Sequence, residues 1–300
     1  FCWLALPLLA GILMAKVRDE VNNVYLLSAL DQSGLMQANS MGRKLQSTLL
    51  FLIPYTLSIA AFPFFCELVD KNDHQKLGEL VTRFGRMLLS VFAPFSLFVA
   101  VAAVPFTSLI FKGGHFDAVA VQRTAVSLAC YTFVLPAAAI EALVMQAFFA
   151  NRRMLAVTLI GILFSSLSIL ISWVGLQVSG GRELLLLAFI AGGFTLSRAF
   201  KCVTLVEMLK KNAPVFPFGQ TAAFMFRVGL AAGLASGASW LLLERVSMIA
   251  DLHGRMGDLI KLAVAGAAFG LVYLSAAYAL RIGEVRELFA LAWTKVRKQA

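Results

Sequence analysis

Apolar stretches long enough to cross a bilayer recur along the whole chain, separated by short polar connections. The pattern predicts spans near residues 1–30, 34–66, 84–111, 118–149, 155–177, 184–209, 220–243 and 258–280. About 20 apolar residues in a helix cover the roughly 30 Å of hydrocarbon in a membrane. Short alternating segments, which are typical of outer-membrane barrels, are missing from the sequence. We therefore expect an all-α, polytopic helical membrane protein with about eight transmembrane helices.

The first span is interrupted by charge. Lys16, Arg18, Asp19 and Glu20 stand between two apolar halves, and neither half would cross the membrane alone. A charge at the centre of a bilayer costs about 2.5–3.5 kcal/mol on insertion scales, so these side chains are not expected to face lipid. On a helix Lys16 and Glu20 are four residues apart and can pair. Either the group lines a polar cavity, or it is a salt-bridge cluster that locks helices together.

Two further spans carry polar side chains at positions where lipid is expected. The second begins with Asn39 and continues through Arg43 and Lys44, and the fourth contains Glu141. An ionisable residue inside a span is a functional candidate by default. The structural alternatives are an ion pair of Arg43 with Asp19 or Glu20, and hydrogen bonds of Glu141 to neighbouring serines.

Composition and charge favour a membrane protein over a nucleic-acid-binding one. Hydrophobic residues make up 60% of the chain and charged residues 14%, well below the roughly 25% charged of soluble domains. The net charge of +10 comes without a basic stripe interleaved with aromatic residues, which argues against nucleic acid. If the chain starts on the cytoplasmic side, most lysines and arginines fall in cytoplasmic segments, as the positive-inside rule requires. That assignment counts Arg198 and Lys201 as cytoplasmic flanks of the sixth span.

The sequence offers no pattern for catalysis, metals or cofactors. The cysteines are scattered through apolar spans, and the histidines lie far apart in connections. Neither a zinc-type spacing, nor a phosphate loop, nor a nucleophile with its base is recognisable. We expect a protein that is not an enzyme and that needs no cofactor.

The connections define the expected organisation. Glu67–Arg83 is polar and predicts a short amphipathic helix on the cytoplasmic face, and Asp117 is placed to cap the fourth span. Asp31–Gly34 predicts a tight turn, and Pro54 and Pro63 predict kinks. The prolines of 210–220 suggest a boundary between a six-helix lobe, 1–213, and a unit of two helices with a basic tail, 214–300. Because Phe1 opens directly on an apolar run, we expect the C-terminal portion of a longer protein.

Three segments resemble the MurJ/MviN family, the lipid II flippases of the MOP exporter superfamily. They are Ile110-Phe-Lys-Gly-Gly-His-Phe-Asp117, Ala147-Phe-Phe-Ala-Asn-Arg152, and Ala38-Asn-Ser-Met-Gly-Arg-Lys-Leu45 with Pro63 beyond it. The resemblance implies that 1–213 corresponds to helices seven to twelve, a MATE/MOP-like C-terminal lobe. It also implies that 214–300 corresponds to the two additional helices.

The resemblance further implies a function. Family members carry a lipid-linked peptidoglycan precursor across the bacterial cytoplasmic membrane by alternating access, with the pyrophosphate in a cationic cavity. Arginine suits this because its planar fork binds phosphate oxygens at two points. Arg43 falls on a functional arginine of the family. Gly42 stands where some members carry an acid, and a family lysine that would fall near Glu141 is not found there. Some members bind sodium through acids and asparagines of helices seven and eleven, and this chain offers Ser168 and Ser172 in the eleventh.

Alternatives remain open in two classes. The cargo could be another undecaprenyl-linked glycan, or the protein could be a MATE-like antiporter, although bases outnumber acids in the first two spans. A protein of a different class would be a transport-dead membrane scaffold that docks cell-wall synthases. Expected partners are an undecaprenyl-pyrophosphate-type oligosaccharide and membrane lipids. The predicted substrate-binding residues are Arg43, Lys16, Arg18, Asp19, Glu20, Asn23, Asn39 and Glu141.

Overall fold

The computed structural model describes residues 2–29, 34–50, 56–111, 113, 116–249 and 254–287. Within these ranges the chain is helical, apart from turns, short connections and an isolated bridge between Gly113 and Phe116. Several predicted features lie outside the described residues: most of the Asp31–Gly34 turn, Pro54, Lys112, His115 and the tail beyond residue 287.

Residues up to 213 form nine helices and one π-helical segment within the described ranges. In chain order they are α1 (Cys2–Glu20), η1 (Val21–Leu26), α2 (Leu35–Leu50), α3 (Thr56–Asp70), α4 (His74–Val101), α5 (Ala103–Phe111), α6 (Ala118–Thr132), α7 (Val134–Ala150), α8 (Met154–Ser179) and α9 (Glu183–Lys210). After a connection come α10 (Phe218–Ile249) and α11 (Arg255–Ala279).

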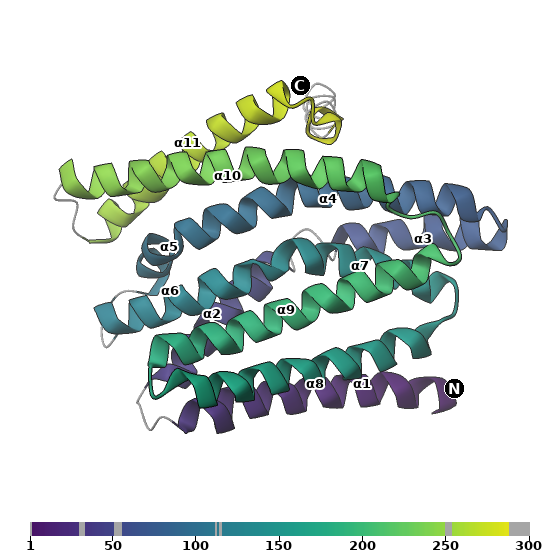
Figure 1. The fold of residues 1–300 in the computed structure, drawn as a ribbon, viewed down its shortest axis with the longest axis horizontal. Helices are drawn as coiled ribbons and strands as arrows, with labels where there is room; N and C mark the ends of the chain where they lie inside the picture. The colour runs from purple at the N-terminus through teal and green to yellow at the C-terminus, as the bar shows by residue number, and fades with distance from the viewer. Residues whose placement is uncertain are drawn as a thin grey trace.

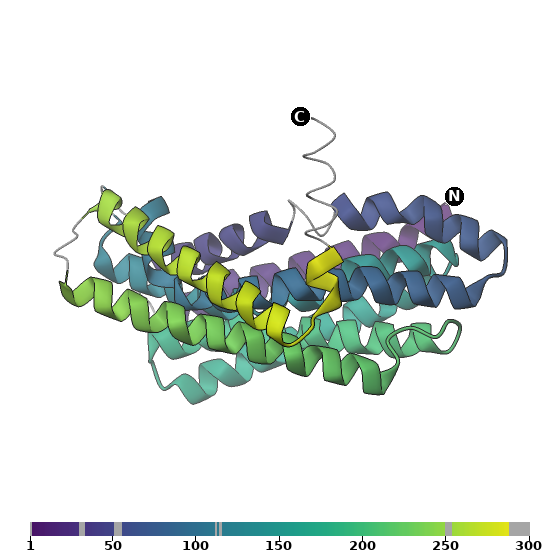
Figure 2. The same ribbon diagram turned by 90° about the horizontal axis from the view of Figure 1, so that it is seen from above.

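The helices run roughly along one direction and are stacked side by side (Figure 1). The pair α1 and α8 forms one edge, followed by α9, and the pair α10 and α11 forms the opposite edge. Seen from above, α11 crosses α10 obliquely (Figure 2). Between these edges α7 packs against α3, α4 and α9, which places it at the centre of the bundle formed by the described residues up to 213.

The predicted polytopic helical class is confirmed. Five described helices are long and apolar enough to cross a membrane, namely α4, α8, α9, α10 and α11. The pair α6 and α7, bent by 42°, would form a sixth span. The first two predicted spans differ from this simple form. The first consists of α1, with its charged end, continued by the π-helical η1, and the second is divided into α2 and α3.

The connection between α3 and α4 corrects one prediction. Glu67–Arg83 is not a separate surface helix; it comprises the end of α3, a short turn, and the first turns of α4. Asp73 caps α4 by accepting a hydrogen bond from the Lys76 amide at 3.1 Å. The hydrogen bond from the Lys76 side chain lowers the pKa of Asp73 below its ordinary value. The amphipathic pattern is that of a long helix whose polar start projects beyond the apolar layer.

Helix α7 is buried on all sides. Every residue from Ala138 to Val144 is buried, including Glu141. A helix that is apolar around its whole circumference belongs in the interior of a bundle. The sequence of α7 therefore places it at the centre of the lobe, and Glu141 is carried there with it.

The α10–α11 pair has an apolar cluster of its own and docks on α4 and α5. The Tyr273 hydroxyl donates to the Ser90 carbonyl at 2.5 Å, and the Phe98 and Phe269 ring centroids are 5.1 Å apart. In the connection before α10, the Phe216 amide donates to the Thr82 hydroxyl at 2.8 Å. The pair is thus tied to the six-helix lobe by buried polar bonds as well as by apolar contact. The division at residue 213 stays a proposal, which the separate apolar cluster supports.

Candidate functional site

Glu141 is held by two cations from a single helix. Its side chain is only 3% exposed, and its carboxylate lies 2.6 Å from Arg198 Nε and 2.8 Å from Lys201 Nζ. Both cations belong to α9, where a spacing of three residues places them on the same face. Glu141 is therefore an ion-paired acid, and the alternative of hydrogen bonds to neighbouring serines is wrong.

Asp19 holds a second pair of cations at the start of the chain. It bonds Arg18 at 2.7 Å, and both terminal nitrogens of Arg43 reach its two oxygens at 2.8 Å. This two-point geometry is the strong form of an arginine–carboxylate pair. Gly42, the residue before Arg43, provides no acid. Arg43 is nevertheless paired, because Asp19 of α1 provides the carboxylate.

The two groups meet around the ring of Phe194. The guanidinium carbons of Arg18, Arg43 and Arg198 lie 4.7, 5.0 and 5.8 Å from its centroid. Cations at such distances are attracted by the negative face of an aromatic ring. Together with Lys201, Asp19 and Glu141, these arginines form a cluster of four cations and two acids. We call it the arginine cluster; its formal charge is positive.

A hydrogen-bonded network of uncharged side chains joins η1, α2 and α6. Asn23 donates to the Ser40 hydroxyl at 2.8 Å, Asn39 donates to the Asn23 carbonyl oxygen at 3.0 Å, and Ser127 donates to the Asn39 carbonyl oxygen at 2.9 Å. Gly42 permits this approach, since a Cβ there would lie 2.9 Å from the Leu128 nitrogen. The asparagines therefore position α2, and Arg43 with it. Segments of π-helix such as η1 are frequent at functional sites.

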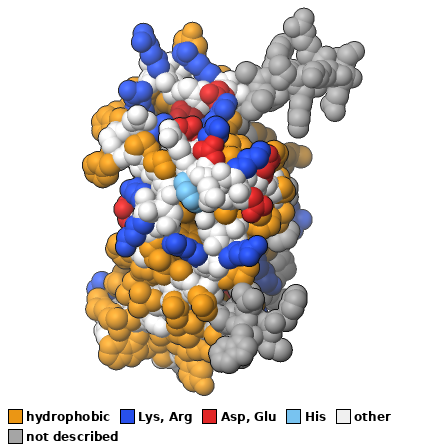
Figure 3. Space-filling model, turned by 90° about the vertical axis from the view of Figure 1, so that its right-hand side faces the viewer, with side chains coloured by type: hydrophobic (Ala, Val, Ile, Leu, Met, Phe, Trp, Pro, Cys, Tyr) orange, Lys and Arg blue, Asp and Glu red, His pale blue; other side chains and the backbone are white. Residues whose placement is uncertain are grey.

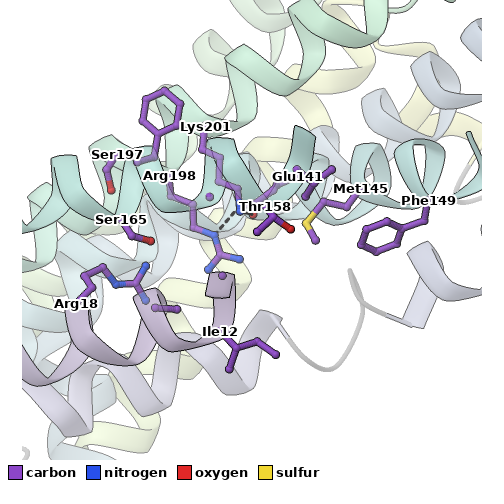
Figure 4. A pocket seen from close by; sticks show the side chains of 15 residues that line it. Ile12, Arg18, Glu141, Met145, Phe149, Thr158, Ser165, Ser197, Arg198 and Lys201 are labelled. Atoms are coloured by element: carbon purple, nitrogen blue, oxygen red, sulfur yellow. Dashed lines mark hydrogen bonds and ion pairs between the residues drawn. The ribbon is translucent and has the colours of Figure 1, made fainter. Parts of the chain in front are cut away.

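A cavity of about 480 Å³ opens between α1, α7, α8 and α9 beside the arginine cluster (Figure 4). Arg198 projects from α9 across the cavity, Lys201 lies beside it, and Arg18 approaches from α1. Hydroxyls and apolar side chains complete the wall. Its remaining labelled lining residues are Ile12, Glu141, Met145, Phe149, Thr158, Ser165 and Ser197.

The structure gathers most of the predicted site residues. Arg18, Asp19, Arg43 and Glu141 belong to the arginine cluster, and Asn23 and Asn39 to the adjoining network. Lys16 and Glu20 differ: both are exposed, and neither forms an ion pair with any described residue. The expected Lys16–Glu20 pair is not formed.

Sequence reasoning missed Arg198 and Lys201. They were assigned to a cytoplasmic flank, but they lie inside α9 and point into the cavity. A signal was available, because a buried acid requires cationic partners and this pair lies on one helix face with Phe194. Helix α7 carries no lysine near Glu141, and it is Lys201 of α9 that lies beside this acid.

The two serines that the sequence offers in place of sodium ligands lie in α8, a helix that contains no acidic residue. Ser168 and Ser172 are buried, and the Ser172 hydroxyl donates to the Ser168 carbonyl at 2.9 Å. Among the described side chains, no group of three or more His, Cys, Asp or Glu residues could hold a metal ion.

Comparisons with known proteins agree with this architecture. A family model described as lipid II flippase MurJ matches residues 2–252. No curated protein sequence matches the chain. A structure of lipid II flippase MurJ in an inward closed conformation is similar, with a TM-score of 0.61, 14% identity, and 90% of this chain and 53% of that chain covered. A structure of a MOP superfamily transporter from Pyrococcus furiosus is also similar, with a TM-score of 0.55, 14% identity, and 94% of this chain and 65% of that chain covered. That transporter is described as having a binding pocket of reverse polarity.

Proposed function

Because the chain belongs to the MurJ lipid II flippase family, we propose that the protein moves a lipid-linked peptidoglycan precursor from the inner to the outer leaflet of the bacterial cytoplasmic membrane. Family and fold support a membrane transport role. The chain covers 53% of the flippase structure to which it is similar, so the activity is proposed for the complete protein.

The observation that carries the proposal is the positive charge of the arginine cluster beside the cavity. Two acids leave four partly buried cations incompletely neutralised beside the cavity. Unbalanced charge in a low-dielectric site is costly, and an anion relieves it. A pyrophosphate suits arginines because each guanidinium offers a fork of donors to phosphate oxygens.

The apolar part of the cavity wall supports an amphiphilic cargo. Ile12, Met145 and Phe149 line the cavity together with Arg18 and Arg198. A polar head could engage the cations while apolar groups remain against these side chains. Asp19 and Glu141 hold the cations in place in the absence of cargo, so loading would exchange acid oxygens for phosphate oxygens. Unloading reverses that exchange, which keeps the free energy of binding moderate.

The alternatives differ in what the site must bind. A cation antiporter would need an excess of acid, and the charge of the arginine cluster disfavours it. A flippase for another undecaprenyl-linked glycan would use the same pyrophosphate contacts. A scaffold without transport would not require cations to face a cavity. Cell-wall synthases are proposed as partners, in keeping with the cargo.

The test uses the complete protein reconstituted in vesicles that contain lipid II in one leaflet. We expect lipid II to become accessible on the other side at a rate that depends on the protein. Vesicles that contain a lipid-linked glycan that is not flipped give the background rate of accessibility. An unchanged leaflet distribution, or extrusion of cationic dyes instead, would contradict the proposal. Transport of a different undecaprenyl-linked glycan at a higher rate would replace the cargo but keep the pyrophosphate chemistry.

A further inference from the structure

A second, smaller cavity lies far from the arginine cluster, where the six-helix lobe meets the α10–α11 pair. Its volume is about 300 Å³, and it opens between α4, the first turns of α10, and the turn that follows α11. The side chains of its polar wall are Arg86, Gln220, Arg227, Arg281 and Glu284.

Arg86 and Glu284 build the floor of this cavity. Arg86 lies 3.9 Å from the Glu284 carboxylate, donates to the Gln220 oxygen at 3.4 Å, and sits 5.7 Å from the Phe224 ring centroid. Both charged side chains are less than one-fifth exposed. The buried Nε of Arg86 has no hydrogen-bond partner among the described residues.

Arg227 and Arg281 form the rim of the cavity. Both are exposed, and neither makes an ion pair within the described part of the chain. Three arginines against one glutamate leave the cavity positively charged. Its chemistry is therefore that of a site for a phosphate or another multivalent oxyanion.

The surroundings of the cavity are apolar. Phe226, adjacent to Arg227, is 71% exposed, and Tyr278, shortly before Arg281, is also 71% exposed. Phe218 at the start of α10 is 84% exposed. The Arg286 guanidinium lies 4.4 Å from the ring centroid of Tyr278, whereas Phe218 and Phe226 expose most of their side chains. Recognition of anionic charge beside exposed aromatic side chains fits an amphiphile with a phosphate head and acyl chains.

The position in the bundle fits the same ligand. The cavity lies toward the end where α3 turns into α4 and α9 leads to α10, and Figure 3 shows basic side chains spread over that face, with acidic ones between them. Basic pockets between transmembrane helices on the cytoplasmic side are typical binding sites for anionic lipid headgroups.

We propose that this cavity binds the phosphate of an anionic glycerophospholipid, whose acyl chains lie against α10 and α11. Contacts with Arg86 on one side and with Arg227 and Arg281 on the other let one lipid join the α10–α11 pair to the six-helix lobe. This inference does not depend on the proposed transport cargo.

The experiment is a titration of the complete purified protein in detergent, followed by native mass spectrometry. The probes are phosphatidylglycerol, phosphatidylethanolamine and inorganic phosphate. We expect phosphatidylglycerol to bind, and the variant Arg227→Gln/Arg281→Gln to bind it more weakly, by about fivefold for each arginine and roughly 30-fold for both. The variant Arg227→Lys/Arg281→Lys should keep most of the affinity, because the charges remain.

The matched control is Arg152→Gln/Arg153→Gln, in the connection between α7 and α8. It removes the same charge, and Arg152 shares the left-handed backbone of Arg281, with φ of 57° against 53°. Unchanged phosphatidylglycerol binding in this control supports the proposal. Equal losses in both glutamine variants, or no loss in the Arg227/Arg281 variant, would overturn it. Displacement of the lipid by millimolar inorganic phosphate would mark a free-anion site and overturn the choice of a lipid.

Discussion

At the scale of the residue, the buried acids decide whether the cations of the site can stay inside the membrane. Glu141 is the clearer case, since α7 is buried around its whole circumference and its carboxylate touches both Arg198 and Lys201. Removing one partner of a buried charge pair costs more than the pair itself contributes, because the remaining charges lose their compensation.

Glu141→Gln should therefore destabilise the protein strongly. We expect a loss of about 3–5 kcal/mol in the free energy of unfolding, measured by thermal unfolding in detergent. The double variant Glu141→Gln/Lys201→Met should recover part of that loss, since one uncompensated cation is gone. Glu207→Gln is the control, because its pair with Lys210 is exposed. An effect of Glu141→Gln no larger than that of Glu207→Gln would contradict the role of Glu141.

Substitutions of Arg43 can distinguish a role in substrate binding from a structural role. If it grips a pyrophosphate, Arg43→Ala should abolish flipping while folded protein stays abundant, and Arg43→Lys should be clearly impaired because the two-point fork is lost. If it serves only Asp19, both variants should instead lower the amount of folded protein. The measurement is transport per folded molecule, with the exposed neighbour in Lys44→Ala as control. Normal transport by Arg43→Ala would remove this residue from the site.

At the scale of the element, glycines set how closely helices approach. Gly42 is the contact of α2 with the α6 backbone, and Gly193 brings α9 against Ile171 of α8, where a Cβ would lie 2.9 Å from a side-chain carbon. Close approach of α2 to α6 also brings Asn39 within reach of Ser127. The orientation of Arg43 thus depends on a residue without a side chain.

Gly42→Ala should force α2 and α6 apart. Overpacking of this kind typically costs about 1–3 kcal/mol, and here it should also weaken the bond between Ser127 and Asn39. Gly229→Ala in α10 is the control, because nothing lies within 4 Å of the added Cβ. That variant should be neutral or slightly more stable, since alanine is the better helix former by up to about 1 kcal/mol. Thermal unfolding of both variants checks this, and equal midpoints would contradict the close-contact argument.

At the scale of the whole molecule, two hydrogen bonds join the described part of α11 itself to α4 and α5. The hydroxyl of Tyr273 crosses the interface to the Ser90 carbonyl, and Ser108 donates to Asp258 at 2.5 Å near the other end of α11. Arg83 and Arg86 of α4 form ion pairs with Glu287 and Glu284, which follow α11. Along α11 the other contacts are largely apolar, and apolar contact alone permits sliding. The two hydrogen bonds define the register of α11 on α4 and α5.

Tyr273→Phe should loosen that register. The buried Ser90 carbonyl would lose its side-chain donor, at a cost of about 0.5–1.5 kcal/mol in thermal unfolding. Tyr278→Phe is the control, because Tyr278 is 71% exposed. We also expect a cysteine pair placed across α4 and α11 to cross-link over a wider range of spacer lengths in Tyr273→Phe. Identical cross-linking in both variants would show that the apolar contacts suffice.

The sequence alone determined the local and periodic features of this protein. Apolar runs indicated the helices because a membrane requires each helix to satisfy its own backbone. Asp117 was identified as a cap, and its carboxylate does accept from the Ala120 amide at 2.8 Å. The charges of α1 and α2 and Glu141 are recognisable from the sequence as unsuited to lipid, because a charged side chain at the centre of a bilayer is costly.

Only the tertiary structure decided which charges meet. Asp19 and Arg43 are 24 residues apart and Glu141 and Arg198 are 57 apart, so neither pair follows from helical spacing. Lys16 and Glu20 have the ideal spacing and are both exposed, yet they do not pair. In the sequence, Arg198 and Lys201 have the pattern of the basic end of a span. Only the packing of α9 against α7 shows that both pair with Glu141. Periodicity defines the faces of a helix, whereas the partner of each face depends on how the bundle packs.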